Sequence, residues 1–262
     1  MCRWAERYLD VQPILSYYIC MTDSIIPFDV LETGALELGI TLSQEQLFLY
    51  DKLARLLIEA NGHTNLTRII DPQDIVNLHY LDSLTCIAAH KPNIKHRAID
   101  VGTGAGFPGL AIKIVDSTLD MTLVDSTGKK IKFVENAIEE LRIEHASAQC
   151  ARAEDLGRNP AYRGQFGTVY ARALAAMPIV AELCLPLLKI GGTLVAQKSG
   201  DVSAELKSAE QIIKELGGII VRVADIAIPG TDIARKIILI RKTQWTSNRF
   251  PRPYSEIIGS KK

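Results

Sequence analysis

A glycine-rich turn between an apolar strand and a helix constrains the fold of this chain most. Residues 98–101 are mostly apolar, residues 100–109 read Asp-Val-Gly-Thr-Gly-Ala-Gly-Phe-Pro-Gly, and an apolar run follows over 110–115. Glycine tolerates positive φ and lets the backbone approach a ligand closely. Pro108 suits the first turn of a helix, where its missing N–H costs nothing. The pattern predicts the strand, turn and helix of an α/β domain, with free helix N–H groups facing a polar ligand.

The spacing of the glycines indicates which ligand the turn holds. A dinucleotide-binding turn needs G-x-G-x-x-G, but Phe107 stands five residues after Gly102. The frame that begins at Gly104 matches formally but starts too far into the turn. The sequence instead resembles motif I of S-adenosylmethionine-dependent methyltransferases, D-x-G-x-G-x-G, in which Asp100 would lie near the cationic methionine end of the cofactor. A purely structural glycine turn is the alternative.

A second acidic residue supports a nucleoside ligand. The apolar run 121–124 ends at Asp125, about twenty residues beyond the turn, where the ribose-binding acid of such folds belongs. Its carboxylate can accept hydrogen bonds from both vicinal ribose hydroxyls. The alternative is a helix N-cap at Asp125 or Ser126, before a helix that begins near Lys129. Dinucleotide enzymes share this acid, so it supports adenosine binding more than methyl transfer.

Composition narrows the function classes. The 262 residues are 47% hydrophobic, enough for one α/β core and a smaller appendage. No apolar run approaches the roughly 18–20 residues of a membrane helix, and residues 1–20 lack the features of a signal peptide. The five cysteines include no C-x-x-C pair, so neither a zinc site nor a disulfide framework is indicated, and we expect a cytoplasmic protein without a metal. The formal net charge of zero confines any nucleic-acid surface to a local patch.

The first half of the chain has a helical pattern. We expect one helix over 28–38. A second should begin at a capping box formed by Ser43 and Gln46 and run to about Ala60, where Asn61-Gly62 would end it. A third should begin at Asp71-Pro72. The predicted divisions are an atypical N-terminal extension (1–24, with Met21 as a second possible start), a helical region (25–92), a cofactor-binding domain (93–245) and a basic C-terminal tail (246–262).

From residue 97 the pattern alternates between strands and helices. Strands are expected near 97–101, 120–125, 146–150, 167–171, 192–197, 219–225 and 235–241. This alternation predicts an α/β fold with a doubly wound, Rossmann-like sheet of seven strands. The two late strands fit the antiparallel terminal hairpin of methyltransferase sheets.

Over about residues 40–255 the chain resembles the small-subunit ribosomal RNA guanine-N7 methyltransferases (RsmG, also called GidB). The residues that carry the resemblance are Asn65-Leu66-Thr67, His79 with Asp82-Ser83, Asp100 to Gly109, Leu123 to Ser126 with Lys129-Lys130, Arg152-Ala153-Glu154, Arg172-Ala173 and Phe250-Pro251-Arg252. The resemblance implies a class I methyltransferase that uses S-adenosylmethionine to methylate N7 of a guanine in the 530 loop of 16S rRNA. The cofactor-binding candidates are Asp100, Gly102, Gly104, Phe107, Asp125, Ala153, Glu154 and Arg172.

The chemistry of N7 methylation fits the residues available. Guanine N7 carries an exposed lone pair and no proton, so it can attack a sulfonium methyl without a general base or a metal, and catalysis rests on positioning. Arg172 is our catalytic candidate because a guanidinium can hold guanine through O6. It could equally bind a phosphate, and a surface salt bridge is the bland alternative.

His79 and Asp82 stand three residues apart and can share a helix face. We favour a structural polar network that links the helical region to the catalytic domain. A lining of the RNA entry is the alternative, and a metal pair lacks a third ligand.

Charge near the C-terminus points to RNA. From Arg235 to Lys262 eight basic residues face one acid, Glu256, which gives +7, with Trp245, Phe250 and Tyr254 interleaved. Stacked bases and paired phosphates of single-stranded RNA need this mixture. The RNA-binding candidates are Lys129, Lys130, Arg249 and Arg252. We expect removal of 246–262 to weaken RNA binding and to spare cofactor binding. A solvated tail or a structural strap is the alternative.

Two other functions remain open at this stage. A small-molecule methyltransferase would have no need of a basic tail. A non-catalytic ribosome- or RNA-binding module would have let the cofactor residues decay, whereas they are intact here. The expected partner is 16S rRNA, the small ribosomal subunit or an assembly intermediate of it, bound by a monomer and away from membranes.

Overall fold

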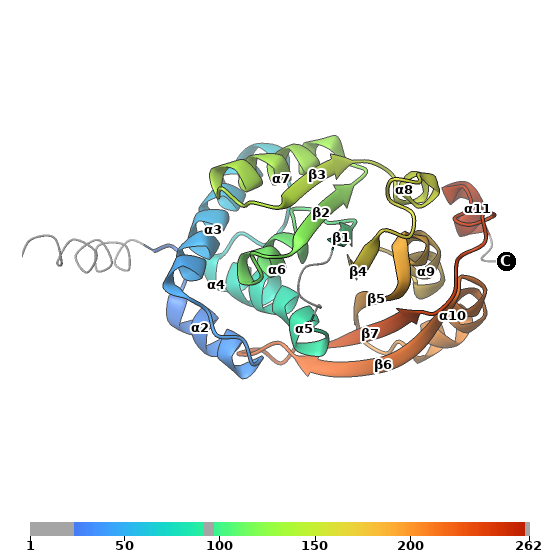
Figure 1. The fold of residues 1–262 in the computed structure, drawn as a ribbon. Helices are drawn as coiled ribbons and strands as arrows, with labels where there is room; N and C mark the ends of the chain where they lie inside the picture. The colour runs from blue at the N-terminus through green and yellow to red at the C-terminus, as the bar shows by residue number, and fades with distance from the viewer. Residues whose placement is uncertain (1–23, 92–96, 260–262) are drawn as a thin grey trace, which may run out of the picture.

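The computed structural model describes residues 24–91 and 97–259, and its centre is a seven-stranded sheet with helices on both faces (Figure 1). The strands are β1 (Arg97–Val101), β2 (Asp120–Asp125), β3 (Ala146–Cys150), β4 (Phe166–Arg172), β5 (Leu188–Ser199), β6 (Gly218–Ala227) and β7 (Ala234–Lys242). Their order is β3-β2-β1-β4-β5-β7-β6. Strands β1 to β5 are parallel to one another, and β7 is antiparallel to both of its neighbours, β5 and β6. All seven predicted strands, the α/β class and the terminal hairpin are confirmed.

The helices form a layer on each face of the sheet. One layer comprises α2 (Phe28–Glu37), α3 (Gln44–Thr64), α4 (Pro72–Asp74), the π-helix η1 (Ile75–Leu81), α5 (Asp82–Ala89), α6 (Gly109–Val115) and α7 (Gly128–Glu140). The other comprises α8 (Ala153–Arg158), α9 (Met177–Cys184), the 3₁₀ turn η2 (Leu185–Leu187), α10 (Ser203–Glu215) and α11 (Tyr254–Gly259).

Successive strand residues pack into different layers. Ala98 belongs to the same apolar core as α2 and α3, whereas its neighbour Ile99 belongs to the core beneath α9 and α10. Strands buried on both faces read as nearly continuous apolar runs, as these do. The helical region predicted for 25–92 therefore shares one core with the sheet.

The capping box of α3 is confirmed, but the predicted end of this helix is wrong. The backbone N–H of Gln46 donates to Ser43 Oγ (3.2 Å), and that of Ser43 donates to Gln46 Oε1 (2.8 Å). The helix continues through Asn61-Gly62 to Thr64 and ends at Asn65, which adopts the left-handed conformation (φ 48°). The side chain of Asn61 accepts a hydrogen bond from Thr67 N (2.9 Å), so tertiary contacts offset the roughly 1 kcal/mol cost of an internal glycine.

The helix predicted at Asp71-Pro72 begins there. The Asp71 carboxylate accepts hydrogen bonds from the N–H groups of Gln73 and Asp74, and Pro72 occupies the first helical position. The helix then widens into η1, which carries His79, and continues as α5 from Asp82. This succession directs His79 and Asp82 towards the sheet, where both are buried.

Part of the prediction concerns the two ends of the chain, which the structure does not describe fully. The N-terminal extension, with Met21, lies outside the described residues except for Ser24, and so do Lys261 and Lys262. Among the residues that the structure describes, no helix is long and apolar enough to cross a membrane.

Candidate active site

The first pocket, of about 290 Å³, opens at the carboxyl ends of the central parallel strands. Its wall includes Gly102, Asp125, Lys130, Arg152, Ala153, Glu154, Ala173, Leu183 and Tyr254. The strand order reverses between β1 and β4, and ligands of open α/β sheets bind at such a switch point. Four of the eight predicted cofactor residues thus meet in one pocket: Gly102, Asp125, Ala153 and Glu154.

Glycine is required at two positions of the turn. Gly102 has φ +74°, and an added Cβ would lie 2.5 Å from Leu174 Cδ1. Gly104 has φ +61° with open space around it, and its N–H donates to Asp125 Oδ2 (3.1 Å). A side chain at either position would strain the backbone.

The buried carboxylate of Asp125 joins the glycine turn to the start of α7. Oδ1 accepts a hydrogen bond from Thr127 N (2.8 Å), Oδ2 accepts the one from Gly104, and Lys130 Nζ lies 3.6 Å from Oδ2. The N-cap of α7 is Thr127, so neither Asp125 nor Ser126 takes that position. A carboxylate has lone pairs for about four hydrogen bonds, so Asp125 can still accept bonds from a ligand.

Asp100 holds the turn from beneath and forms no part of the pocket wall. It is fully buried, and its Oδ2 accepts hydrogen bonds from Thr103 Oγ1 (2.6 Å) and Gly109 N (2.9 Å). Burial raises the pKa of Asp100 to about 6, against the effect of these two hydrogen bonds. These contacts give Asp100 a role in shaping the turn, its Oδ1 has no hydrogen-bond partner among the described residues, and its contact with the cofactor stays a prediction.

A second pocket, of about 510 Å³, adjoins the first. Its wall consists of Ile69, Leu78, His79, Asp82, Arg172, Ala173, Gln197, Lys198, Ser199, Glu205, Ile233 and Arg235. Ala173 belongs to the walls of both pockets and is a non-glycine residue with positive φ (51°). The two pockets therefore meet at the end of β4.

Of the other predicted cofactor residues, Arg172 lines the second pocket, and Phe107 lines neither pocket but packs against His79 in the wall of the second. Phe107 stacks face to face on the ring of His79, with centroids 4.4 Å apart, and the guanidinium carbon of Arg172 lies 5.6 Å from the Phe107 centroid. The side chain of Arg172 lines the second pocket, while the strand end it occupies leads to the first.

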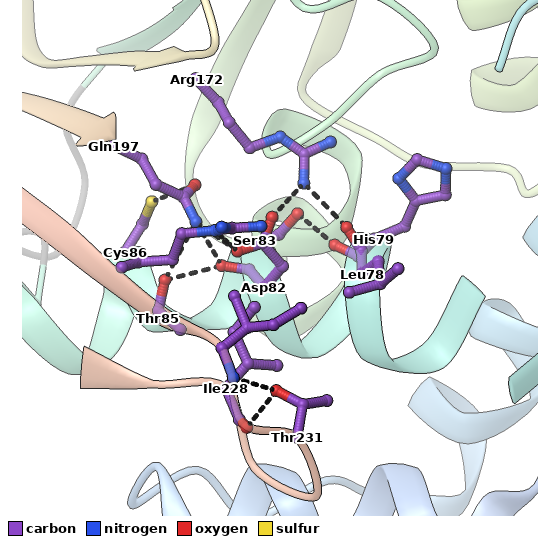
Figure 2. Close-up of polar contacts among 12 residues, drawn as sticks. Leu78, His79, Asp82, Ser83, Thr85, Cys86, Arg172, Gln197, Ile228 and Thr231 are labelled. Atoms are coloured by element: carbon purple, nitrogen blue, oxygen red, sulfur yellow. Dashed lines mark hydrogen bonds and ion pairs between the residues drawn. The ribbon is translucent and has the colours of Figure 1, made fainter. Parts of the chain in front are cut away.

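Asp82 is the centre of a buried polar network (Figure 2). Its Oδ2 accepts a hydrogen bond from Arg172 Nη1 (3.0 Å), and its Oδ1 accepts from Arg235 Nε (2.7 Å) and Gln197 Nε2 (2.6 Å). Arg172 Nη1 also lies 3.4 Å from the carbonyl oxygen of Leu78. The predicted network between the helical region and the sheet is confirmed, and it also lines the second pocket. The surface salt bridge considered for Arg172 is in fact a buried ion pair.

His79 is a neutral member of this wall. Burial and then the nearby Arg172 charge lower its pKa to about 3. One ring nitrogen, Nε2, lies 3.2 Å from Thr67 Oγ1, and the other, Nδ1, is buried without a hydrogen-bond partner among the described residues.

Within the residues that the structure describes, much of the basic C-terminal stretch is paired rather than free, which corrects the sequence interpretation. Four of its charges pair with acids elsewhere in the chain: Arg235 with Asp82, Lys236 with Asp225, Arg249 with Glu215, and Arg252 with Glu182. Arg252 donates from Nε (2.9 Å) and Nη2 (2.6 Å) to the two oxygens of Glu182, whose side chain is only 1% exposed. We therefore remove Arg252 from the RNA-binding candidates.

The segment from residue 246 packs as a strap. The guanidinium of Arg163 donates to the carbonyl oxygens of Thr246 and Phe250 (both 2.7 Å), and Phe250 and Ile257 are buried. Tyr254 lies in the wall of the first pocket, a placement that sequence distance had hidden. The expectation that its removal spares cofactor binding is therefore withdrawn.

The predicted lysines lie beside the first pocket. Lys129 Nζ donates to the carbonyl oxygen of Thr64 (3.0 Å) at an exposed position, and Lys130 approaches Asp125.

Comparison with known proteins gives consistent matches. The sequence profile of the family described as rRNA small subunit methyltransferase G (GidB) matches residues 45–229. The Ribosomal RNA small subunit methyltransferase G of Alkaliphilus oremlandii is 38% identical over 86% of this chain and 94% of its own length. That of Deinococcus deserti is 39% identical over 86% and 91%, respectively.

Solved structures share the fold at low sequence identity. A chain from the complex of a Haloferax volcanii methyltransferase activator with a methyltransferase has TM-score 0.52 and 12% identity, over 78% of this chain and 100% of its own. An Aquifex aeolicus SAM-dependent methyltransferase has TM-score 0.50 and 14% identity, over 68% and 97%.

Proposed function

Because the chain belongs to the rRNA small subunit methyltransferase G family and is thus an S-adenosylmethionine-dependent rRNA methyltransferase, we propose that it methylates N7 of a guanine in 16S rRNA. The observation that carries the proposal is the meeting of the two pockets at Ala173. One pocket suits the cofactor, the other suits a base and its phosphate, and the methyl group would pass between them.

The residues of the first pocket fit S-adenosylmethionine, which supplies a methyl group on a positively charged sulfur. Gly102 lies in the wall, Gly104 in the same turn has open space where a side chain would stand and so permits close approach, and Asp125 would accept hydrogen bonds from the ribose hydroxyls. Ala153 and the buried Glu154 complete the wall at the start of α8. These five residues are our proposed cofactor-binding set.

The second pocket fits an electron-rich partner. Arg172 and Arg235 line it, and a guanidinium can donate to guanine O6 or to a phosphate oxygen. N7 carries no proton, so the residues need only bind the base, orient it towards the first pocket and exclude water. His79 is held neutral, so the two arginines supply the positive charge at this part of the wall.

The proposal also includes the residues that contact the RNA and the form in which the RNA is bound. We propose that Lys129 and Lys130 contact the RNA backbone beside the first pocket, and we keep Arg249, whose side chain is exposed, as a further contact. The substrate would be the small subunit or its assembly intermediate, bound by a monomer in the cytoplasm, where that substrate is made. A small-molecule substrate is the runner-up, since the paired charges of the strap no longer argue against it.

Mapping methylated guanines in 16S rRNA tests the proposed function. RNA from cells with and without this protein is digested to nucleosides and fragments and analysed by mass spectrometry, and the purified protein is incubated with the unmodified RNA. We expect one N7-methylguanine that depends on the protein. Methylation at another guanine atom, or none in the presence of the protein, would contradict the proposal.

Replacement of Asp125 by alanine is expected to weaken S-adenosylmethionine binding by about 1.5–3 kcal/mol, the range for hydrogen bonds to a charged group. Calorimetry measures the affinity. Asp116→Ala is the matched control, because Asp116 makes the same kind of turn contact, accepting from Thr118 N (3.1 Å), away from both pocket walls. Unchanged affinity in folded Asp125→Ala would remove Asp125 from the cofactor site.

A further inference from the structure

Asp82 connects two arginines that come from separate strands. Arg172 ends β4 and Arg235 lies in β7, and β5, which carries Gln197, separates these strands in the sheet. The carboxylate, 4% exposed, accepts one hydrogen bond from Arg172 on Oδ2 and one each from Arg235 and Gln197 on Oδ1. Both guanidinium groups are thus fixed to a single anion at the wall of the second pocket, and Figure 2 shows the contacts of Asp82 with Arg172 and Gln197.

The unused donors of the two arginines are available to a ligand. A guanidinium carries five N–H groups in a rigid planar fork. The contacts among the described residues engage Nη1 of Arg172, with Asp82 and Leu78, and Nε of Arg235. Nε and Nη2 of Arg172 and both terminal nitrogens of Arg235 make no hydrogen bond within that part of the chain. Because the fork is planar, the atom that each arginine gives to Asp82 determines the direction of the remaining donors.

Charge favours an electron-rich ligand at this wall. Two guanidinium groups against one carboxylate leave an excess of one positive charge, and the nearby Lys198 is paired with Glu205 (2.8 Å). Arginine forks pair with the O6 and N7 edge of guanine and with phosphate oxygens. Two such groups at a fixed separation can hold a nucleotide at two points.

We propose that Asp82 is the positioning residue of this reaction: it fixes Arg172 on the target guanine and Arg235 on the adjoining phosphodiester of the RNA. This inference rests on the proposed function and adds to it the residue that orients the substrate. Asp82 touches neither the reacting atoms nor the cofactor in this scheme. Its loss would let both forks rotate, and misplacement by about 1 Å can slow a reaction about 10²-fold.

The test compares Asp82→Asn with a matched control in the full chain. Asp51 is also a buried aspartate paired with an arginine, Arg55 (2.8 Å), and it accepts hydrogen bonds from the N–H groups of Ile25 and Ile26 outside both pocket walls. Methyl transfer to 16S rRNA in small subunits that lack the modification gives kcat and KM, calorimetry gives S-adenosylmethionine affinity, and thermal unfolding gives Tm. Asp82→Asn is expected to lower kcat/KM about 10²-fold with cofactor affinity within twofold, whereas Asp51→Asn lowers Tm alone.

A double-mutant cycle separates positioning from stability. If Asp82 acts through the two arginines, Asp82→Asn should have little further effect on kcat in a background that carries both Arg172→Ala and Arg235→Ala, because residues of one network are not additive. Additive losses, or an unchanged kcat in folded Asp82→Asn, would overturn the proposal. If Asp82→Asn fails to fold, Asp82→Glu keeps the charge but shifts the carboxylate by one methylene, and an unaltered kcat there would also overturn it. If the wild-type protein leaves 16S rRNA unmodified, the proposed function fails rather than this inference.

Discussion

Replacement of Arg172 by alanine is expected to lower the rate of methyl transfer to 16S rRNA about 10²-fold, the effect of removing one preorganised donor from a reacting site. The guanidinium lines the second pocket beside Ala173, where the two pockets meet. Asp82 keeps its bond from Arg235 in the variant, so its charge stays paired and the fold should persist. Turnover of unmodified 16S rRNA, measured by incorporation of labelled methyl groups, checks the result.

Arg222→Ala is the matched control for loss of an arginine. Arg222 lies on β6, and its guanidinium lies 3.5 Å from the carbonyl oxygen of Ala89, outside both pocket walls. Its variant should methylate at the wild-type rate. A wild-type rate for Arg172→Ala would show that our catalytic candidate is wrong. A selective loss of S-adenosylmethionine binding would instead assign Arg172 to the cofactor pocket.

Replacement of Arg252 by alanine is expected to lower the free energy of unfolding by about 3 kcal/mol, because it leaves the buried Glu182 without its partner. The value lies at the low end for a broken buried pair, since water can reach Glu182 once the half-buried arginine is truncated. The strap carries Tyr254, so S-adenosylmethionine binding should weaken as well. Denaturant unfolding and calorimetry measure the two effects.

Arg249→Ala is the control within the same strap. Its ion pair with Glu215 is exposed on both sides, with side chains 65% and 35% accessible, so its loss should cost only about 0.2–1 kcal/mol. Equal stability of the two variants would show that the strap is not held by Glu182. A fall in RNA affinity for Arg252→Ala without any loss of stability would restore the original interpretation of an RNA-binding tail.

The sequence determined the parts of the fold that depend on local pattern. Alternation of apolar strands and helices predicted all seven strands, and the spacing from Gly102 to Asp125 predicted two elements of one pocket. These predictions succeed because parallel strands bring their carboxyl ends to one edge of the sheet, so residues that end neighbouring strands must meet. Nothing beyond local order along the chain is needed for that step.

The tertiary structure decided which basic side chains are free to contact RNA and which are paired within the protein. The excess of basic residues after Arg235 indicated an RNA-binding tail, but Asp82, Glu182 and Glu215 neutralise three of them from positions 34 to 153 residues away. A net charge counted along the sequence describes a surface only when partners are close in the chain, because ion pairs form by distance in space. Burial likewise places Asp100 beneath the turn and not in the wall of the first pocket, which the sequence alone does not show.

The sequence by itself therefore determined the class of fold, the family and the edge of the sheet that holds the first pocket. Each of these depends on residues that are close together along one or two elements. Only the tertiary structure decided that Asp82 joins Arg172 to Arg235, that Tyr254 reaches the first pocket, and that the second pocket lies next to it. The physical reason is that these contacts depend on how elements far apart in the sequence pack together: α5 against β4, β5 and β7 for Asp82, and α11 beside the first pocket for Tyr254. The strengths of such side-chain contacts depend on burial and direction, neither of which a linear pattern contains.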